Sequence, residues 1–134
     1  MTRNLGALHA RDVDRPEIVA EVRDAFEEYE RALVAHDLAE LDAAFWEDDR
    51  VVRFGIADDQ RGAQAVAAWR RVSGPVAAGR VLHDTAITTF GSDVAIVTTK
   101  FTDDASGIGR QSQVWMRVDG SWCIVSAHVS RVDG

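Results

Sequence analysis

The sequence predicts an α+β domain in which three N-terminal helices pack on the concave face of a curved antiparallel sheet and enclose a pocket. Apolar residues recur at helical spacing in the first half of the chain and with a period of two in the second half. Strands and helices do not alternate as a parallel sheet would require. With 134 residues and 46% hydrophobic residues, the chain suffices for one core. We therefore expect a flexible arm over residues 1–14 and one domain over residues 15–131.

The first helix is expected to begin at Asp14 and to run to about His36. Asp14 is a suitable N-cap residue, because Pro16 follows in the first turn and Glu17 stands three residues after it. Apolar residues then recur every three or four positions, with acids and arginines between them. This pattern predicts a long amphipathic helix.

Two shorter helices and a strand are expected to follow. Asp37 resembles the cap of a second helix that ends at residues 48–49. Residues 50–55 form a short β-rich run closed by glycine, and the alanine-rich residues 62–71 predict a third helix. A Ser-Gly-Pro break at residues 73–75 ends that helix.

Four long strands are expected after that break, and turn residues define their connections. Gly91-Ser92 is typical of a type II′ turn, and Asp119-Gly120 of a type I′ turn. Because these turns join adjacent strands, the four segments form an antiparallel meander: residues 81–90, 94–102, 108–118 and 122–131.

The Asp119-Gly120 turn predicts which side chains share a face of the last hairpin. In a regular ladder Gln113 faces Ser126 and Gln111 faces His128, which places both glutamines and His128 beside Trp115 and Ile124. The opposite face is apolar and carries these residues: Val114, Met116, Cys123, Val125, Ala127 and Val129. Because an apolar face of this extent is unfavourable in water, it must be buried by another subunit or another element, and we expect a homodimer through the outer sheet face. Pairing of dimers into tetramers is left open.

Composition excludes several classes of partner and site. A net charge of −7 argues against nucleic acid or an anionic membrane as a partner. Phosphate loops, dinucleotide fingerprints and metal-ligand spacings are absent, so no cofactor and no metal are expected. The single cysteine, Cys123, excludes an intrachain disulfide and favours a cytoplasmic location; a buried residue is its expected role rather than a nucleophile. Genome or lineage bias is the main explanation for fourteen arginines against one lysine, but any anion site in this chain would still use guanidinium groups.

Five residues are candidates for a site. Tyr29 lies on the apolar face of the first helix and is either a core residue or a hydroxyl that faces a cavity. Arg53 lies between two apolar strand residues and is either a strand-end surface group or a cavity guanidinium that binds a carboxylate. Gln111, Gln113 and His128 form a polar group that either binds a ligand or lies at an exposed sheet edge.

The order of elements and three segments resemble one known family. The order resembles the cone-shaped, cystatin-like fold of ketosteroid isomerase, scytalone dehydratase and the SnoaL-like polyketide cyclases. Residues 21–55, 87–95 and 109–130 are similar to the AtzH-like family, linked to cyanuric acid catabolism and, as HpxZ, to oxalurate catabolism. The most specific parts are Gly-Arg-Gln-Ser-Gln at 109–113 and the run from Trp122 to Ser130.

The resemblance implies a decarboxylating amidohydrolase that converts 1,3-dicarboxyurea, a small dianion, into allophanate without a cofactor. The catalytic tyrosine and arginine of the family correspond to Tyr29 and Arg53. Two positions depart from the family pattern: Phe54 replaces a tyrosine, and Lys100 replaces a glutamate. The alternative is a non-catalytic module of the same fold that binds a ligand or serves as an accessory subunit in purine or s-triazine catabolism.

Overall fold

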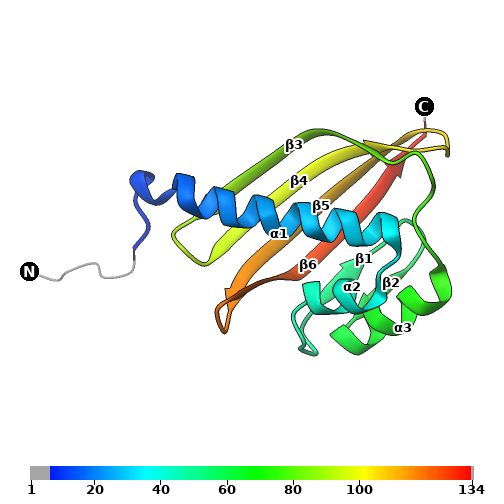
Figure 1. Ribbon diagram of the computed structural model, residues 1–134, viewed down its shortest axis with the longest axis horizontal. Helices are drawn as coiled ribbons and strands as arrows, with labels where there is room; N and C mark the ends of the chain where they lie inside the picture. Colours follow the sequence, from blue (N-terminus) through cyan, green and yellow to red (C-terminus); the bar gives the residue numbers. More distant parts are fainter. Residues whose placement is uncertain (1–6, 134) are drawn as a thin grey trace, which may run out of the picture.

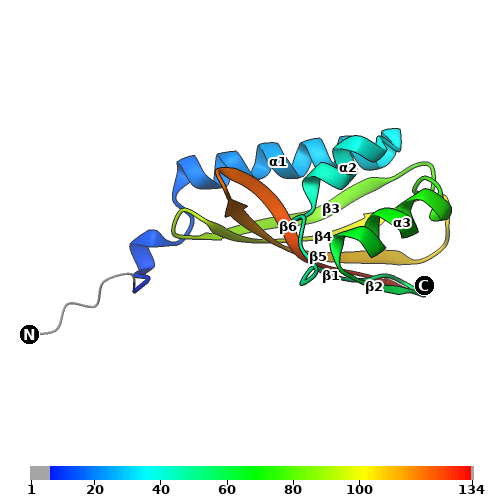
Figure 2. The ribbon, with the colours of Figure 1, turned by 90° about the horizontal axis from the view of Figure 1, so that it is seen from below.

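The computed structural model describes residues 7–133, in which three helices lie on one face of a six-stranded sheet (Figures 1 and 2). The sheet order is β2-β1-β6-β5-β4-β3. No helix of the described residues is long and apolar enough to cross a membrane. The elements have these bounds: η1 Ala10–Asp12, α1 Pro16–Ala35, α2 Leu38–Ala44, β1 Val52–Phe54, β2 Asp59–Arg61, α3 Ala63–Ser73, β3 Val81–Phe90, β4 Val94–Thr102, β5 Ile108–Val118 and β6 Ser121–Val132.

One strand pair makes the sheet mixed rather than antiparallel. β1 runs parallel to β6, whereas every other neighbouring pair is antiparallel. The parallel direction is established before β1 begins, because Phe45 already forms a parallel bridge with Ile124 and the Trp46 N–H donates to the Ile124 carbonyl at 3.0 Å. The predicted fold class is confirmed, and this pairing corrects its strand directions.

The segment before α1 is attached to the end of the β3–β4 hairpin. Helix α1 begins at Pro16 with Arg15 as N-cap, so the predicted cap at Asp14 is wrong. Asp14 has a positive φ of 57°, and its carboxylate accepts a hydrogen bond from the Thr89 N–H at 2.9 Å. The sequence predicts a flexible arm over residues 1–14; its part from His9 to Asp14 is instead hydrogen-bonded, whereas residues 1–6 lie outside the described residues.

Short elements differ more from the prediction than long ones. Asp37 caps α2 as expected, with its carboxylate accepting from the Glu40 N–H at 3.2 Å, but α2 ends at Ala44. The strand β2 is not predicted, because its Asp-Gln-Arg sequence has no β-rich pattern. The Gly91 turn contains three residues rather than two, since Phe90 pairs with Val94.

A β-bulge in the last hairpin changes the predicted register. The turn at Asp119-Gly120 is confirmed by positive φ values at both residues, and Trp115 pairs with Ile124 as predicted. Beyond that pair Val125 is an extra residue, because Val114 pairs with Ser126. From this point Gln113 pairs with Ala127 and Gln111 with Val129, so the predicted partners Ser126 and His128 are wrong.

The bulge also exchanges side chains between the two faces of the sheet. Ala127 and Val129 turn toward the helices, while His128 is exposed on the outer face, where its ring lies 5.6 Å from that of Phe54. The outer face is therefore less apolar than predicted. Val114 and Met116 remain there and are half-buried.

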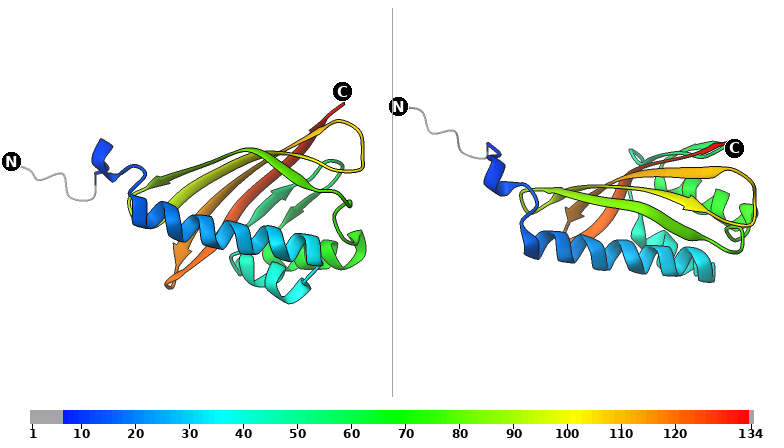
Figure 3. Two further views of the ribbon diagram at one scale, coloured as in Figure 1. Left: turned by 45° about the horizontal axis from the view of Figure 1, so that its top comes forward. Right: turned by 90° about the horizontal axis from the view of Figure 1, so that it is seen from above.

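Helix α1 runs along one face of the sheet (Figure 3), and the core residues lie between this helix, α2 and the sheet. Val22, Phe26 and Tyr29 follow one another on one face of α1, at the spacing that the sequence predicts. They pack against fully buried sheet residues such as Trp115 and Val97. Toward β1 and α3 the packing is incomplete, and a pocket remains.

Candidate active site

The pocket has a volume of about 230 Å³ and lies between α1, α3 and the concave face of the sheet. Its walls combine aromatic and aliphatic side chains with four arginines and one aspartate, an unusual concentration of positive charge for a chain of net charge −7. The charged and aromatic lining residues are Tyr29, Arg53, Trp69, Arg70, Arg80, Phe101, Asp103 and Arg131. A cavity of this size and charge suits a small anion.

Tyr29 reaches this pocket from α1. Its ring makes edge contacts with Phe45 and Trp115, at centroid distances of 6.2 and 6.1 Å, and only 8% of the residue is exposed. Burial raises the pKa of Tyr29, and Arg70 is the strongest of the nearby charges that act in the opposite direction. The hydroxyl therefore stays protonated at neutral pH and can donate a proton or a hydrogen bond.

Arg53 reaches the pocket from β1, and three neighbours fix its guanidinium. Its Nη1 donates to Asp58 at 2.7 Å and to Gln60 at 2.9 Å. The group also lies over Trp69, with Cζ 3.5 Å from the ring centroid. The side chain is 12% exposed, and its hydrogen bonds to the described residues 7–133 use Nη1 alone, so Nε and Nη2 remain for a ligand.

Gln111 and Gln113 are buried on the inner face of β5, and each has a polar partner. The Gln113 carbonyl accepts from the Trp115 indole N–H at 2.9 Å. Gln111 donates to Glu30 at 3.1 Å and accepts from Arg80 at 3.2 Å. The exposed-edge alternative is thus wrong for both residues, and they line the pocket.

His128 does not line the pocket with Gln111 and Gln113. A regular ladder would place His128 in the ligand-binding group with Gln111 and Gln113, but the bulge at Val125 turns it to the outer face of the sheet. This corrects the prediction for His128, which is exposed and does not line the pocket.

Three pocket arginines were missed by the sequence reasoning: Arg70, Arg80 and Arg131. Arg80 forms a two-pronged ion pair with Glu30, at 2.8 and 3.2 Å, and Arg131 pairs with Asp103 at 2.9 Å. Only Arg70 carried a local signal, since it follows the apolar Val66 by four residues and so lies on the buried face of α3. Arg80 and Arg131 are buried through ion pairs with residues distant in sequence, which no local sequence pattern predicts.

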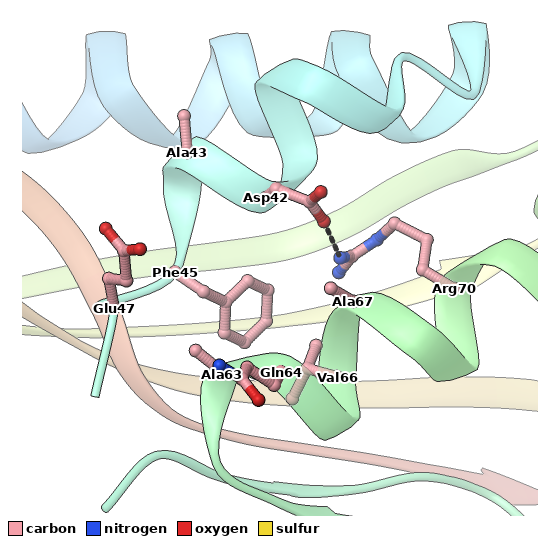
Figure 4. A pocket seen from close by; sticks show the side chains of 9 residues that line it. All are labelled: Asp42, Ala43, Phe45, Glu47, Ala63, Gln64, Val66, Ala67 and Arg70. Carbon is pink, nitrogen blue, oxygen red and sulfur yellow. Dashed lines mark ion pairs between the residues drawn. The ribbon is translucent and has the colours of Figure 1, made fainter. Parts of the chain in front are cut away.

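Arg70 lies at the wall between this pocket and a second one. The second pocket, of about 400 Å³, lies between α2 and α3, and its acidic lining residues are Asp42 and Glu47 (Figure 4). The side chain of Arg70 extends from α3 toward Asp42 on α2, with its Nη1 3.7 Å from Asp42 Oδ1. Neither Tyr29 nor Arg53 lines this second pocket, so the smaller one is the better candidate site.

The model of the AtzH-like family matches residues 11–134. The chain belongs to the AtzH-like family. A cystatin-like fold protein from Burkholderia xenovorans is similar over 96% of this chain and 99% of its own, with 46% identity and a TM-score of 0.90. A protein of unknown function from Pectobacterium atrosepticum covers 95% of this chain and 100% of its own, with 38% identity and a TM-score of 0.91.

More distant structures of this AtzH-like protein's fold support the architecture alone. An NTF2-like superfamily protein from Salmonella enterica has 20% identity and a TM-score of 0.71, over 88% of this chain and 93% of its own. Among curated proteins the chain has no match. The cystatin-like fold that the sequence predicts is therefore confirmed, and the NTF2-like structure shares its architecture.

The two departures from the expected family pattern lie outside the pocket. Phe54 is 45% exposed and contacts His128 on the outer face. Lys100 is exposed, and its nearest carboxylate is Asp84 at 3.8 Å. Within residues 7–133, no group of three or more histidine, cysteine, aspartate or glutamate side chains is arranged to hold a metal ion.

Proposed function

We propose that this AtzH-like protein is a decarboxylating amidohydrolase that acts on a small dianionic carboxylated urea such as 1,3-dicarboxyurea and forms allophanate. The observation that carries the proposal is that Tyr29 and Arg53, which lie 24 positions apart in sequence, line one small cationic pocket. Family membership supports the same reaction class.

Arg53 suits the role of carboxylate anchor. Its contacts with Asp58, Gln60 and Trp69 fix the plane of the guanidinium before a ligand arrives. A planar fork with free Nε and Nη2 can bind both oxygens of a carboxylate. Because little side-chain freedom is left to lose, the cost of binding is small.

Tyr29 suits the role of proton donor. When the bond between nitrogen and the carboxylate carbon breaks, the carboxylate leaves as CO₂ and the electron pair stays on nitrogen. That nitrogen takes the phenol proton of Tyr29, and water then returns a proton to the phenolate. The products are one CO₂ and allophanate, and the net consumption is one proton. The pKa of Tyr29, raised by burial, keeps this proton in place until the bond breaks.

The test measures CO₂ release from freshly prepared 1,3-dicarboxyurea by wild-type, Tyr29→Phe and Arg53→Ala proteins. We expect Tyr29→Phe to lower kcat about 100-fold or more, as loss of a general acid does. Arg53→Ala should mainly raise KM, because it removes an anchor. His128→Ala, on the outer face, is the matched control and should retain wild-type rates.

Equal rates in all four proteins would contradict the site assignment. Binding of small dianions by wild-type protein without CO₂ release would instead support the alternative, a non-catalytic ligand-binding or accessory module of the same fold.

A further inference from the structure

The four pocket arginines differ in how far neighbouring carboxylates neutralise them. Arg80 has both oxygens of Glu30, Arg131 has Asp103, and Arg53 has Asp58. Each of these ion pairs has an N–O distance of 2.9 Å or less. A guanidinium already paired at such distances attracts a further anion less strongly.

Arg70 is the exception. Its side chain is 4% exposed, and within residues 7–133 its Nη1 makes no hydrogen bond. The nearest carboxylate oxygen, Asp42 Oδ1 at 3.7 Å, is also without a hydrogen-bond partner in this part of the chain. Nη1 faces Asp42, while Arg70 also lines the pocket beside Tyr29, so a ligand carboxylate there would lie next to a buried cation that no short ion pair among the described residues neutralises.

The adjacent residue Arg71 explains why Asp42 does not close this gap. Arg71 Nη2 donates to Asp42 Oδ2 at 2.8 Å, and Arg71 Nη1 donates to the carbonyl of Ala67 at 2.8 Å, which holds the arginine along α3. The carboxylate of Asp42 is thereby held toward the surface. Its other oxygen stays beyond hydrogen-bond distance of Arg70.

We propose that Arg70 is a second anion-binding residue of the pocket, which receives a carboxylate beside Tyr29, and that Arg71 keeps Arg70 available by holding Asp42. The identity of the anion as the second carboxylate of a carboxylated urea rests on the proposed function. Arg53 and Arg70 come from β1 and α3 and line the pocket together with Tyr29. Two separate guanidinium groups select a dianion over a monoanion of similar size.

The test measures malonate binding by calorimetry, with acetate as the monoanion, and monitors folding by circular dichroism and thermal unfolding. Arg70→Gln should weaken malonate binding about tenfold or more, since a charge-assisted hydrogen bond is lost. Asp42→Asn should strengthen it by about two- to fivefold, because it removes the competing carboxylate. Arg71→Gln should weaken it, because Asp42 is then free to pair with Arg70.

The double variant Asp42→Asn/Arg71→Gln should recover at least wild-type affinity, since no carboxylate remains to compete. Arg61→Gln is the control for the loss of one positive charge, because Arg61 is exposed and forms no ion pair within the described residues. If Arg70→Gln fails to fold, the Asp42 and Arg71 variants still decide the matter, because these residues are partly exposed.

A purely structural Arg70–Asp42 ion pair predicts that folded Asp42→Asn binds malonate no better than wild type, and that result would overturn the inference. So would wild-type malonate affinity in Arg70→Gln. If the protein releases CO₂ but binds malonate independently of Arg70, the proposed function is supported and the inference about Arg70 is wrong. If malonate binding depends on Arg70 but no CO₂ is released, the inference is supported and the proposed function is wrong.

Discussion

At the scale of single residues, the chemistry of the pocket depends on what lies next to each side chain. Tyr29 is packed between Phe45 and Trp115, so its hydroxyl is held in a low-dielectric environment with Arg70 as its strongest favourable charge. Arg53 lies over Trp69. These contacts restrict the Tyr29 ring and the Arg53 guanidinium to one position each in the pocket wall.

Tyr29 is the only tyrosine of the chain, so its ionisation can be followed directly by ultraviolet absorbance. We predict that the pKa of Tyr29 in the folded protein lies above its ordinary value of 10.0, because burial disfavours the phenolate. In concentrated urea the midpoint should return to the ordinary value. Arg70→Gln should raise the folded-state pKa further, since it removes the charge that most favours the phenolate.

The raised pKa of Tyr29 also makes the free energy of unfolding depend on pH. Below the ordinary pKa the phenol is protonated in both states, and stability is at its full value. As the pH rises above it, the unfolded chain loses the proton first, so the free energy of unfolding falls. Tyr29→Phe should remove this dependence. If Tyr29 titrates in the folded protein at or below its titration midpoint in urea, burial does not raise its pKa and the prediction is wrong.

At the scale of elements, the pocket wall depends on how β4 and β5 fit together. Phe101 of β4 pairs with Gly109 of β5, and the guanidinium groups of Arg80 and Arg131 lie 4.2 and 5.5 Å from the Phe101 ring centroid. A Cβ atom at Gly109 would collide with the Phe101 ring. The glycine is therefore required by the packing of a neighbouring strand rather than by a turn.

Gly109→Ala is expected to lower the free energy of unfolding by about 1–3 kcal/mol, because it overpacks the site of the Phe101 ring. Displacement of that ring should also weaken malonate binding, since Arg80 and Arg131 lose their support. Urea denaturation and calorimetry measure the two effects. Ser112→Ala, at an exposed position of β5, is the control and should change neither by much. Wild-type stability in Gly109→Ala would contradict the claim that the packing of Phe101 requires glycine at this position.

At the scale of the whole molecule, an acidic chain surrounds a cationic pocket, and the outer face of the sheet remains partly apolar. Ile96 is 41% exposed there, beside the half-buried Val94, Val114 and Met116. The bulge at Val125 removes two predicted members, Ala127 and Val129, from this face. The surface is smaller than the sequence suggests but still carries adjacent apolar side chains from neighbouring strands.

We keep the homodimer through this outer face as a proposal. Ile96→Arg should shift the protein toward monomer in sedimentation velocity, because a charge buried at such an interface is strongly unfavourable. Val34→Arg is the matched control, since Val34 is 64% exposed on α1, away from this face. A wild-type protein that sediments as a monomer at every concentration tested would contradict the proposal.

The local sequence pattern was sufficient to predict the long helices and strands and to place Tyr29 on the buried face of α1. The bounds of β3, β4 and β5 follow from alternation between turns, and Tyr29 follows from the apolar stripe of α1. Three-residue strands such as β2 are held by pairing with a neighbour, so their own sequence carries little signal. The same holds for Arg80, whose burial depends on Glu30, 50 positions earlier.

The sequence by itself determined the fold class and the main helices and strands, and it indicated five candidate site residues, His128 among them. These features depend on periodicity and turn residues, which act over a few positions. Only the tertiary structure decided which face His128 occupies and which pocket arginine has the longest ion pair. One extra residue, Val125, reverses the faces of the strand beyond it, and the ion pairs join segments distant in sequence. Because such pairings depend on the packed arrangement of the whole chain, no local pattern specifies them.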